Sequence, residues 1–495
     1  MEKESLRVNL DGEIAQTPHP RALGSALTHP CITTDYSEAL LEFITPPYPE
    51  LSDTLRALGD IHAFVYRNLD QELLWATSMP CVVGGDESIP IAEYGSSNVG
   101  RMKHIYRRGL DHRYGRIMQA IAGVHFNYSL PEAFWPAYQR VLGEQGSLKN
   151  FRSEHYFRLI RNFQRHGWLI SYLFGASPAL CRSFLAGREH NFAQFEQHTL
   201  YAPHATSLRM SDIGYKNKAQ AGLKVCYNTL ETYIASLTRA ITTPAPDYAA
   251  IGTQVDGTWR QLNTNILQIE NEYYSFIRPK AVAESGERPT LALDRAGVEY
   301  VEIRALDVNA FDPMGLDAAQ LRFIEAFLLL CLLQDSPPID HDEQAEIGYN
   351  QAQVAVRGRE PGLTLRRRGE HILLSDWATH LCEAMAELCE ILDQNEDEPV
   401  YQAALDDQIG KVRDPDLTPS ALMLSDMREH NESFIEFALR LSTQHAAFFR
   451  RWPLSTEARL DMEAAAAASI REQAAIEAAD TLDFETYLAN YFAQQ

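Results

Sequence analysis

The sequence lacks several features by which large functional classes are recognised. It contains no glycine-rich GxxxxGK[ST] phosphate loop, no GxGxxG dinucleotide turn, and neither a GxSxG nor an HExxH motif. Its longest apolar run, residues 326–333, is far shorter than the roughly 18 residues that a membrane span needs. Residues 1–4 show no signal-peptide pattern. We therefore expect no membrane partner and a cytoplasmic location.

Basic residues are scarce relative to acidic ones. The chain of 495 residues has 44 Lys and Arg against 67 Asp and Glu, a net charge of −23. Such a surface repels nucleic acids and anionic membranes, but small anionic ligands experience only the local pocket. Cysteine is also sparse, with seven scattered residues and no CxxC pair. We expect reduced, buried thiols and neither a disulfide framework nor a zinc cluster.

Hydrophobic periodicity divides the chain near residue 310. Before this point, short period-two segments, typical of strands, alternate with helical ones. The period-two segments are residues 39–45, 123–130, 265–270 and 298–306. Beyond residue 315 the pattern predicts mainly helices, at residues 319–334, 375–394, 430–450 and 457–478. Exposed loops are predicted at residues 281–289 and 335–343.

Carboxylates recur at strand positions that share a face, because residues i and i+2 of a strand point the same way. The residues related in this way are Glu2 with Glu4, His125 with Asn127, and Tyr300 with Glu302 and Arg304. Glu42 lies within residues 39–45, seven positions after Asp35. Each acid taken singly could be a surface residue. Together, carboxylates and a histidine are compatible with Mg²⁺ or Mn²⁺, so the spacing indicates an oxygen-rich metal site inside a sheet.

Without a phosphate loop, any bound ATP would be held by metal-bridged carboxylates and by cationic side chains. Segments with candidate cations are residues 94–102, 106–108, 208–212 and 277–280. Arginines near serines are usually solvated. Arg304 differs because it shares a strand face with Glu302, as expected of a charge-stabilising residue beside a metal ligand. No residue is assigned to the adenosine of ATP.

Long and unusual segments follow one another through the first two thirds of the chain. They include EKESLRVNLDG (2–12), WATSMPC (75–81), and residues 19–46, 92–115, 118–131, 158–181, 201–220, 262–280 and 298–313. In this order they resemble the bacterial class of the glutamate–cysteine ligase (γ-glutamylcysteine synthetase) family. The resemblance continues more weakly through residues 414–421 to the C-terminus.

The resemblance implies an α+β, glutamine-synthetase-like fold, in which an antiparallel sheet forms a carboxylate-lined funnel surrounded by helices. We expect a catalytic core at residues 1–333 and a mostly helical C-terminal region at 334–495 packed on it. Family members also carry a segment before the EKE motif. Of two explanations for its absence here, a misassigned start codon is favoured over a trimmed chain.

The resemblance also implies roles for individual residues. The implied metal ligands are Glu2, Glu4, Asp35, Glu42, His125 and Glu302. The implied cysteine pocket consists of Tyr36, Tyr106, Leu110, Gln119, Arg209, Tyr215 and Tyr274. In this pocket aromatic and apolar walls would hold the thiol, and Arg209 and the tyrosines would bind the carboxylate. Arg304 and Arg107 would face the transferring phosphate.

The implied activity is the first step of glutathione synthesis. ATP and Mg²⁺ (or Mn²⁺) would join the γ-carboxyl of L-glutamate to the amine of L-cysteine through a γ-glutamyl phosphate, in a cytoplasmic monomer. Three alternatives stay open. They are a ligase of the same fold with another amine acceptor, an inactive or truncated relative that binds glutamate or ATP, and a metal-dependent hydrolase.

Overall fold

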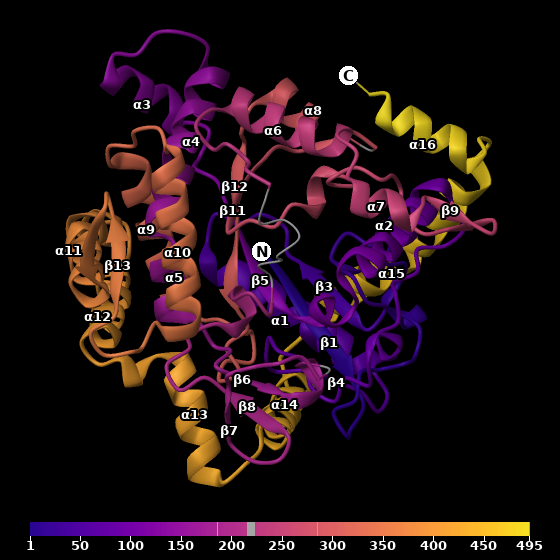
Figure 1. Ribbon diagram of the computed structural model, residues 1–495, viewed down its shortest axis with the longest axis horizontal. Coiled ribbons are helices and arrows are strands. Elements are labelled where there is room, and N and C mark those ends of the chain that lie inside the picture. Colours follow the sequence, from indigo (N-terminus) through magenta and orange to yellow (C-terminus); the bar gives the residue numbers. More distant parts are fainter. Residues whose placement is uncertain (186, 215–222, 285, 495) are drawn as a thin grey trace.

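The computed structural model describes residues 1–185, 187–214, 223–284 and 286–494. A seven-stranded sheet lies at its centre, with strand order β11-β12-β5-β1-β3-β2 and β4 paired to β1. All of its pairings are antiparallel (Figure 1). The strands are β1 (Glu2–Val8), β2 (Ile32–Thr34), β3 (Leu40–Ile44), β4 (Leu73–Leu74), β5 (Gly123–Tyr128), β11 (Ile277–Lys280) and β12 (Tyr300–Asp307). This arrangement confirms the predicted α+β fold with an antiparallel sheet.

Helices surround the sheet. They are α1 (Leu51–Asn68), α2 (Asn98–Tyr114), α3 (Phe134–Leu142), α4 (Leu148–His166), α5 (Trp168–Phe174), α6 (Leu230–Thr242), α7 (Pro246–Ile251), α8 (Pro289–Ala296), α9 (Ala318–Leu333), α10 (His341–Arg357), α11 (Leu374–Asp393), α12 (Val400–Arg413), α13 (Pro419–His430), α14 (Phe434–Arg450), α15 (Thr456–Ala479) and α16 (Phe484–Phe492). Among the described residues, no helix combines the length and the apolar character that crossing a membrane requires.

Short elements complete the chain. The small sheets consist of β6 (Ala179–Cys181), β7 (Ala193–Gln194) and β8 (Thr199–Tyr201), of β9 (Gln254–Val255) with β10 (Thr258–Trp259), and of β13 (Thr364–Arg367) with β14 (Glu370–Leu373). The 3₁₀ turns are η1 (Arg21–Leu23), η2 (Asp86–Ser88), η3 (Ile117–Ala120), η4 (Arg182–Leu185), η5 (Leu208–Met210), η7 (Glu270–Glu272) and η8 (Pro415–Leu417).

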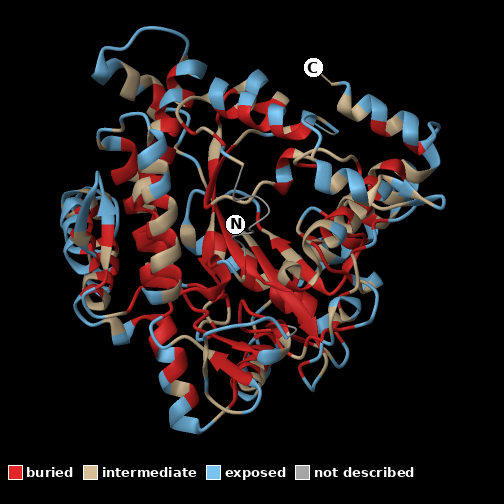
Figure 2. Ribbon diagram, in the orientation of Figure 1, coloured by how far each residue is buried: buried red, intermediate tan, exposed pale blue. Residues whose placement is uncertain are grey.

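The two faces of the central sheet differ, as strand alternation requires. On β12, Val301 and Ile303 are fully buried in the core. On β3, the Phe43 ring packs on His62 of α1, with centroids 4.7 Å apart. Helices α4 and α5 contact β11 and β12, and Figure 2 shows the sheet as a continuous buried layer. The residues between these core positions point to the other face, where the candidate site lies.

The C-terminal helices return to the N-terminal part of the chain. The Ser25 backbone N–H donates to Ser469 of α15 at 2.9 Å, and the Ser25 hydroxyl donates to Gln473 at 2.5 Å. The Asn98 side chain at the start of α2 donates to the Leu482 carbonyl at 2.9 Å. These contacts hold α16 against α2 beside the sheet. The predicted domain boundary at residue 333 coincides with the end of α9 and stays a prediction.

Three predicted elements differ from the structure, and one of them, the loop predicted at 335–343, is cut short because α10 begins at His341. Residues 265–270 are not a strand, because side chains satisfy the backbone there. The Gln268 N–H donates to Glu272 at 2.6 Å, and the Gln268 side chain accepts from the Leu262 N–H at 3.0 Å. The helix predicted at 430–450 begins only at Phe434, since Asn431 is left-handed (φ 53°) and Ser433 forms a capping box. The other three C-terminal helices agree with the prediction to within one residue at either end.

The expectation of reduced thiols is also wrong for one pair. Cys81 follows β4 and Cys181 ends β6, and the two form a disulfide with Cα atoms 5.2 Å apart. They are 100 residues apart in the sequence, a separation that carries no pairing signal. The other five cysteines are free thiols, as expected.

Candidate functional site

A cavity of about 670 Å³ opens on the non-core face of the central sheet, and we call it the main cavity. Strands β1, β3, β5, β11 and β12 contribute to its wall, together with α2, α8 and α16. Its polar lining includes Glu2, Asp35, Glu42, Lys103, Tyr106, Arg107, His125, Arg278, Lys280, Tyr300, Glu302 and Arg304. Its apolar lining includes Val99, Met102, Ile269, Pro289 and Leu293.

Three of the predicted metal ligands converge on one point. Each of Glu2, His125 and Glu302 offers a ligand atom within 4.8 Å of the other two. Strand pairing explains this convergence, since Glu2 lies opposite His125 across β1 and β5, and Glu302 lies opposite Asn127 across β12 and β5. The Asn127 amide then donates to Glu2 Oε1 at 2.9 Å and fixes that carboxylate.

The other predicted ligands lie beside this group. Glu4 and Glu42 are direct cross-strand partners on β1 and β3. Glu4 Oε1 lies 3.9 Å from His125 Nε2, and its Oε2 accepts the Gly123 N–H at 2.5 Å. Asp35 lies just after β2 and lines the main cavity. The structure therefore gathers all six at one end of the sheet, with Glu4 behind His125.

The electrostatics of the carboxylates are uneven. Burial and the neighbouring charge of Asp35 raise the pKa of Glu4 to about 8. Burial and the charges of Glu2, Asp35 and Glu4 raise the pKa of Glu42 well above its usual range. Without a cation, these two carboxyls would retain protons near neutral pH.

Two carboxylates stay ionised because cations and hydrogen bonds outweigh burial. Burial opposes ionisation of Glu2, but its hydrogen bond with His125 contributes to lowering its pKa to about 2. Burial likewise opposes ionisation of Glu302, but Lys280 and Arg304 hold its pKa well below the usual range. Burial and the Arg304 charge lower the pKa of His125 and favour the neutral ring, the form that can ligate a metal.

The donor set fits a hard divalent cation. Among the described residues, His125 Nε2 and Glu302 Oε2 are buried without a hydrogen-bond partner, although a buried polar atom normally has one. Oxygen ligands with one imidazole nitrogen suit Mg²⁺ or Mn²⁺. A dication at this point would also compensate the charge that now favours protonation of Glu4 and Glu42.

Cationic side chains surround the carboxylates. Arg304 Nη1 donates to Glu302 Oε1 at 2.9 Å, and Lys280 Nζ lies 3.7 Å from Glu302 Oε2. On α2, Arg107 Nη1 donates to the Lys103 carbonyl at 2.9 Å, and Arg107 Nε donates to the Asp35 carbonyl. The Arg107 guanidinium stacks over Tyr94, 4.6 Å from the ring centroid. A polyphosphate entering the main cavity would meet these cations and the carboxylates together.

Among the residues implied for the cysteine pocket, Tyr106 lines the main cavity, and Arg209 lies behind its wall. Next to Tyr106, the Tyr274 hydroxyl and the Gln119 side-chain amide lie 3.1 Å apart, and Leu110 is buried one helical turn after Tyr106. Tyr36 is buried, and its hydroxyl has no hydrogen-bond partner among the described residues.

Arg209 is buried behind β12 and does not belong to the lining of the main cavity. Its Nη2 donates to the Arg304 carbonyl at 3.1 Å, and its Nη1 lies 3.7 Å from Asp307 Oδ1. A Cβ at position 123 would lie 2.0 Å from Arg209 Nη2, so only glycine permits this approach. Tyr215 lies outside the described residues.

Sequence reasoning missed several residues of the lining, and Lys103, Tyr487 and Tyr491 are among them. Lys103 lies one position beyond the segment 94–102 and four before Arg107, so helical spacing could have found it. Tyr487 and Tyr491 come from α16 and are likewise four positions apart. Nothing local connects α16 with the strands. Arg278 and Lys280 do line the cavity and come from the predicted segment 277–280.

Comparison with known proteins identifies the family. The family profile described as glutamate-cysteine ligase matches residues 1–354. The glutamate–cysteine ligase of Pseudomonas paraeruginosa is 53% identical over 493 residues, covering 100% of this chain and 93% of the relative. That of Azotobacter vinelandii is 54% identical over 496 residues, covering 100% and 94%.

A solved structure gives the same answer. The crystal structure of glutamate–cysteine ligase from Francisella tularensis in complex with AMP superposes with a TM-score of 0.93 at 36% identity, covering 99% of this chain and 96% of that one. Sequence and fold thus agree over nearly the whole length, and the chain belongs to the glutamate–cysteine ligase family.

Proposed function

We propose that the main cavity binds ATP with Mg²⁺ and brings the γ-phosphate next to glutamate and cysteine. The observation that carries this proposal is the convergence of acidic side chains and cations on one face of the sheet. The residues proposed to hold Mg²⁺ are Glu2, Glu4, Asp35, Glu42, His125 and Glu302. Mn²⁺ would fit the same donors.

As a member of this family, the chain is a carbon–nitrogen ligase that joins glutamate to cysteine at the expense of ATP, the first step of glutathione synthesis. The reading as an inactive relative is not favoured, because the similarity to curated ligases extends over the whole chain.

The proposed reaction has two steps. The γ-carboxylate oxygen of glutamate attacks the γ-phosphorus of ATP, and ADP leaves, so that an acyl phosphate forms. The cysteine amine then attacks the acyl carbon, phosphate leaves, and the nitrogen loses a proton. Mg²⁺, when bound, offsets the negative charge of the phosphate oxygens. We assign Arg304 and Arg107 to the transferring phosphoryl group, where their fixed charges stabilise the developing negative charge.

The apolar end of the main cavity is the proposed place of the adenine. Met102 and Ile269 line it, and the rings of Tyr487 and Tyr491 close it from α16. The complex of the Francisella enzyme with AMP supports an adenine nucleotide as the ligand of this fold. Flat apolar and aromatic walls suit a planar base.

The cysteine pocket is proposed on the side of α2 that carries Tyr106. Tyr106 and Leu110 would form its wall, and the Gln119–Tyr274 pair would supply polar contacts. Tyr36 and Tyr215 belong to the same proposal. Because Arg209 is buried beside Asp307 and behind this wall, we propose that its positive charge favours the cysteine carboxylate without contacting it directly.

Phosphate release from ATP tests the reaction. Release should require glutamate, cysteine and a divalent metal together, and a chelator should stop it. 2-Aminobutyrate and glycine, offered in place of cysteine, test the choice of amine. Release without any amine would indicate a hydrolase, and ATP binding without release would indicate an inactive relative.

We also propose a cytoplasmic monomer that binds neither nucleic acid nor membranes. Light scattering after gel filtration tests the oligomeric state.

A further inference from the structure

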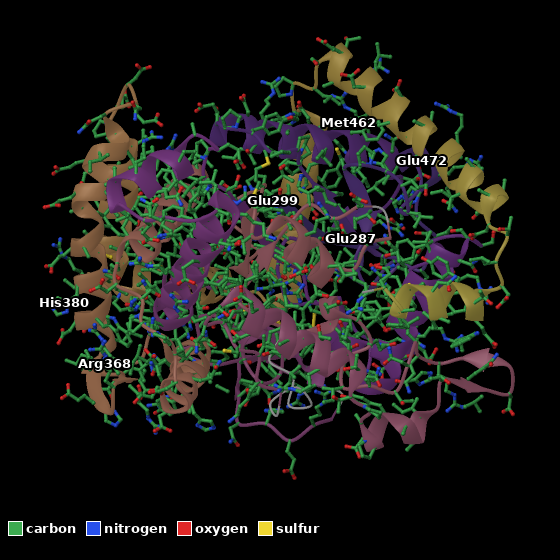
Figure 3. All side chains as sticks on the ribbon, turned by 90° about the horizontal axis from the view of Figure 1, so that it is seen from above. Glu287, Glu299, Arg368, His380, Met462 and Glu472 are labelled. Carbon is green, nitrogen blue, oxygen red and sulfur yellow. A yellow bond between two sulfur atoms is a disulfide. The ribbon has the colours of Figure 1, made fainter. Side chains whose placement is uncertain are left out.

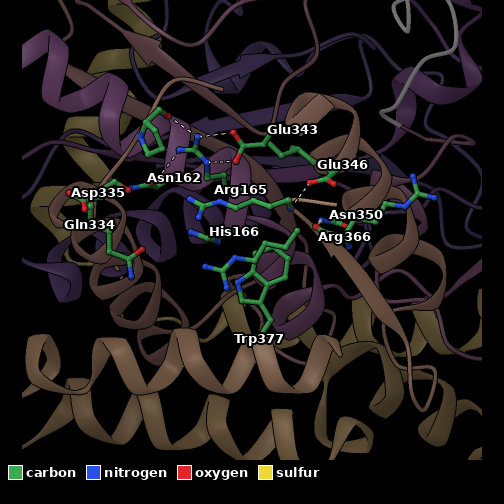
Figure 4. Close-up of a pocket in the computed structure, with 14 residues that line it drawn as sticks. Asn162, Arg165, His166, Gln334, Asp335, Glu343, Glu346, Asn350, Arg366 and Trp377 are labelled. Atoms are coloured by element: carbon green, nitrogen blue, oxygen red, sulfur yellow. Dashed lines mark hydrogen bonds and ion pairs between the residues drawn. The ribbon is translucent and has the colours of Figure 1, made fainter. Parts of the chain in front are cut away.

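A second cavity lies away from the central sheet, at the β13–β14 hairpin, and we call it the hairpin cavity. Its volume is about 280 Å³, less than half that of the main cavity. Helices α4, α10 and α11, the hairpin and the segment after α9 line it (Figure 4). The two cavities share no lining residue. In Figure 3, Glu287, which lines the main cavity, lies near the centre, and Arg368, which lines the hairpin cavity, lies at one edge.

The acidic side chains on α10 in this cavity are already engaged. Glu343 forms a two-point ion pair with Arg165, with Nε–Oε1 at 2.6 Å and Nη2–Oε2 at 2.9 Å (Figure 4). Glu346 accepts the backbone N–H groups of Arg368 and Gly369 at 2.9 and 2.7 Å. One acid is therefore neutralised by Arg165, and the other holds the turn of the hairpin.

Three consecutive arginines line the same cavity without such compensation. Among the described residues, Arg366, Arg367 and Arg368 form no ion pair with a carboxylate. Their backbone is fixed, because the Asn350 side chain exchanges two hydrogen bonds of 2.7 Å with the main chain of Arg366. The Arg367 guanidinium lies over Trp377 of α11, 5.2 Å from the ring centroid. The three side chains are exposed, and they present positive charge in a chain of strongly negative net charge.

A buried, unpartnered polar group lies in the wall. His166, the last residue of α4, is 8% exposed, and its Nδ1 has no hydrogen-bond partner among the described residues. Its ring meets Trp377 edge to face, with centroids 5.7 Å apart. Burial and the charges of Arg367 and Arg165 lower its pKa to about 3. The ring is thus neutral, and the potential that acts on it is positive.

We propose that the hairpin cavity is a binding site for a small anion that carries carboxylate or phosphate groups. Guanidinium groups match the geometry of both oxyanions, and the held backbone that carries them reduces the entropy lost on binding. The neutral His166 ring, which lines the cavity, supplies a further polar contact. No step of the ligase reaction uses these residues.

Calorimetric titration of the full chain tests this site, with ADP and Mg²⁺ present so that the main cavity is occupied. Inorganic phosphate and succinate are the two probes. We expect wild type to bind at least one of them, and Arg367→Gln to weaken that binding by about tenfold or more. Binding of phosphate alone or succinate alone identifies the anionic group that the site takes.

Two further variants separate binding from general damage to the fold. Asp335→Asn removes a negative charge that lines the cavity, so it should tighten binding, an effect that structural damage would not produce. Arg471→Gln removes the same charge as Arg367→Gln from the exposed face of α15 and should change nothing. Equal affinities in wild type and Arg367→Gln, or no binding of either probe by wild type, would overturn the proposal.

Discussion

The main cavity and the hairpin cavity both contain acids and arginines, but the acids are compensated differently. At the main cavity, Glu42 in the lining and Glu4 behind His125 face other carboxylates, and the pKa of each is raised. In the hairpin cavity, Glu343 has a two-point partner in Arg165. The first cavity therefore holds carboxylates that compete for protons or a cation although cationic side chains line it too, and the second holds arginines without a carboxylate partner among the described residues.

This difference determines which ligand each cavity attracts. Burying several carboxylates together is unfavourable unless protons or cations neutralise them, so the main cavity favours a dication. Uncompensated guanidinium groups favour an anion. Net charge predicts neither preference, because the same chain, at −23, contains both proposed sites. The arrangement of partners around each charge decides the outcome.

The largest expected effect comes from removing one charge of the main cavity. Glu302→Gln should lower the rate of cysteine-dependent phosphate release by about a hundredfold or more, because a proposed metal ligand and the partner of Arg304 are lost together. The measurement is steady-state turnover at saturating ATP, glutamate, cysteine and Mg²⁺.

Glu325→Gln is the matched control for this variant. Glu325 is also a hydrogen-bonded carboxylate, accepting from the hydroxyls of Tyr128 at 3.2 Å and Tyr401 at 2.7 Å, but it lies outside both cavities. It should retain turnover. Near-normal turnover in Glu302→Gln would contradict the assignment of the main cavity.

A smaller effect is expected where the proposed pocket is uncharged. Tyr274→Phe removes the hydroxyl that contacts Gln119 and should raise KM for cysteine by about fivefold, the value of one neutral hydrogen bond. KM for ATP should not change. Tyr401→Phe removes a buried hydroxyl elsewhere and should leave both constants unchanged. A parallel rise in KM for ATP and cysteine would mean that Tyr274 supports the fold, not the pocket.

The sequence predicted the strand-borne part of the main cavity because alternation is local. Glu2 and Glu4, or Glu302 and Arg304, share a face whatever the rest of the chain does, provided that the segment is a strand. The family resemblance added Asp35, which lies in a loop. In contrast, Tyr491 reaches the cavity through packing of α16, and Cys81 meets a partner 100 residues away.

The hairpin cavity shows a second limit of sequence reasoning. The run of three arginines at 366–368 is visible in the sequence, but a charged run usually lies on a solvated face. Its meaning depends on Glu343 and Glu346, which are engaged by Arg165 and by the hairpin backbone. Such compensation is a property of tertiary contacts and has no local signature.

Mg²⁺ should distinguish the cavities by melting temperature. It should raise Tm of wild type and of Arg367→Gln by a few degrees, and of Glu302→Gln by less, since a ligand that binds only the folded state stabilises it.

Without metal, Glu4 retains its proton in the folded state up to about pH 8 but loses it near 4.5 when unfolded. Stability is therefore lost as pH rises through this window, and the Mg²⁺ effect should grow from pH 6 to pH 8. A shift independent of pH would contradict the raised pKa.

The smallest effect concerns His166 in the hairpin cavity. Its pKa is lowered from 6.5 to about 3 in the folded state. As pH falls, the unfolded chain therefore takes up this proton at a higher pH than the folded chain. Stability from this group is present above pH 6.5 and is lost as pH falls toward 3. The decrease in Tm from pH 7 to pH 5 should therefore be about a degree smaller in His166→Gln than in wild type.

Phosphate sharpens this last test. An anion beside His166 would favour its protonated form, so phosphate should reduce the acid loss of Tm in wild type but not in His166→Gln. His445→Gln is the matched control, because His445 is equally buried and its pKa is also lowered to about 3, by burial and by Lys3. It lines neither cavity. In His445→Gln the loss of Tm at acid pH should be smaller than in wild type, but phosphate should still reduce that loss as it does in wild type. A phosphate effect that survives in His166→Gln would place the anion elsewhere and remove the contrast between the cavities.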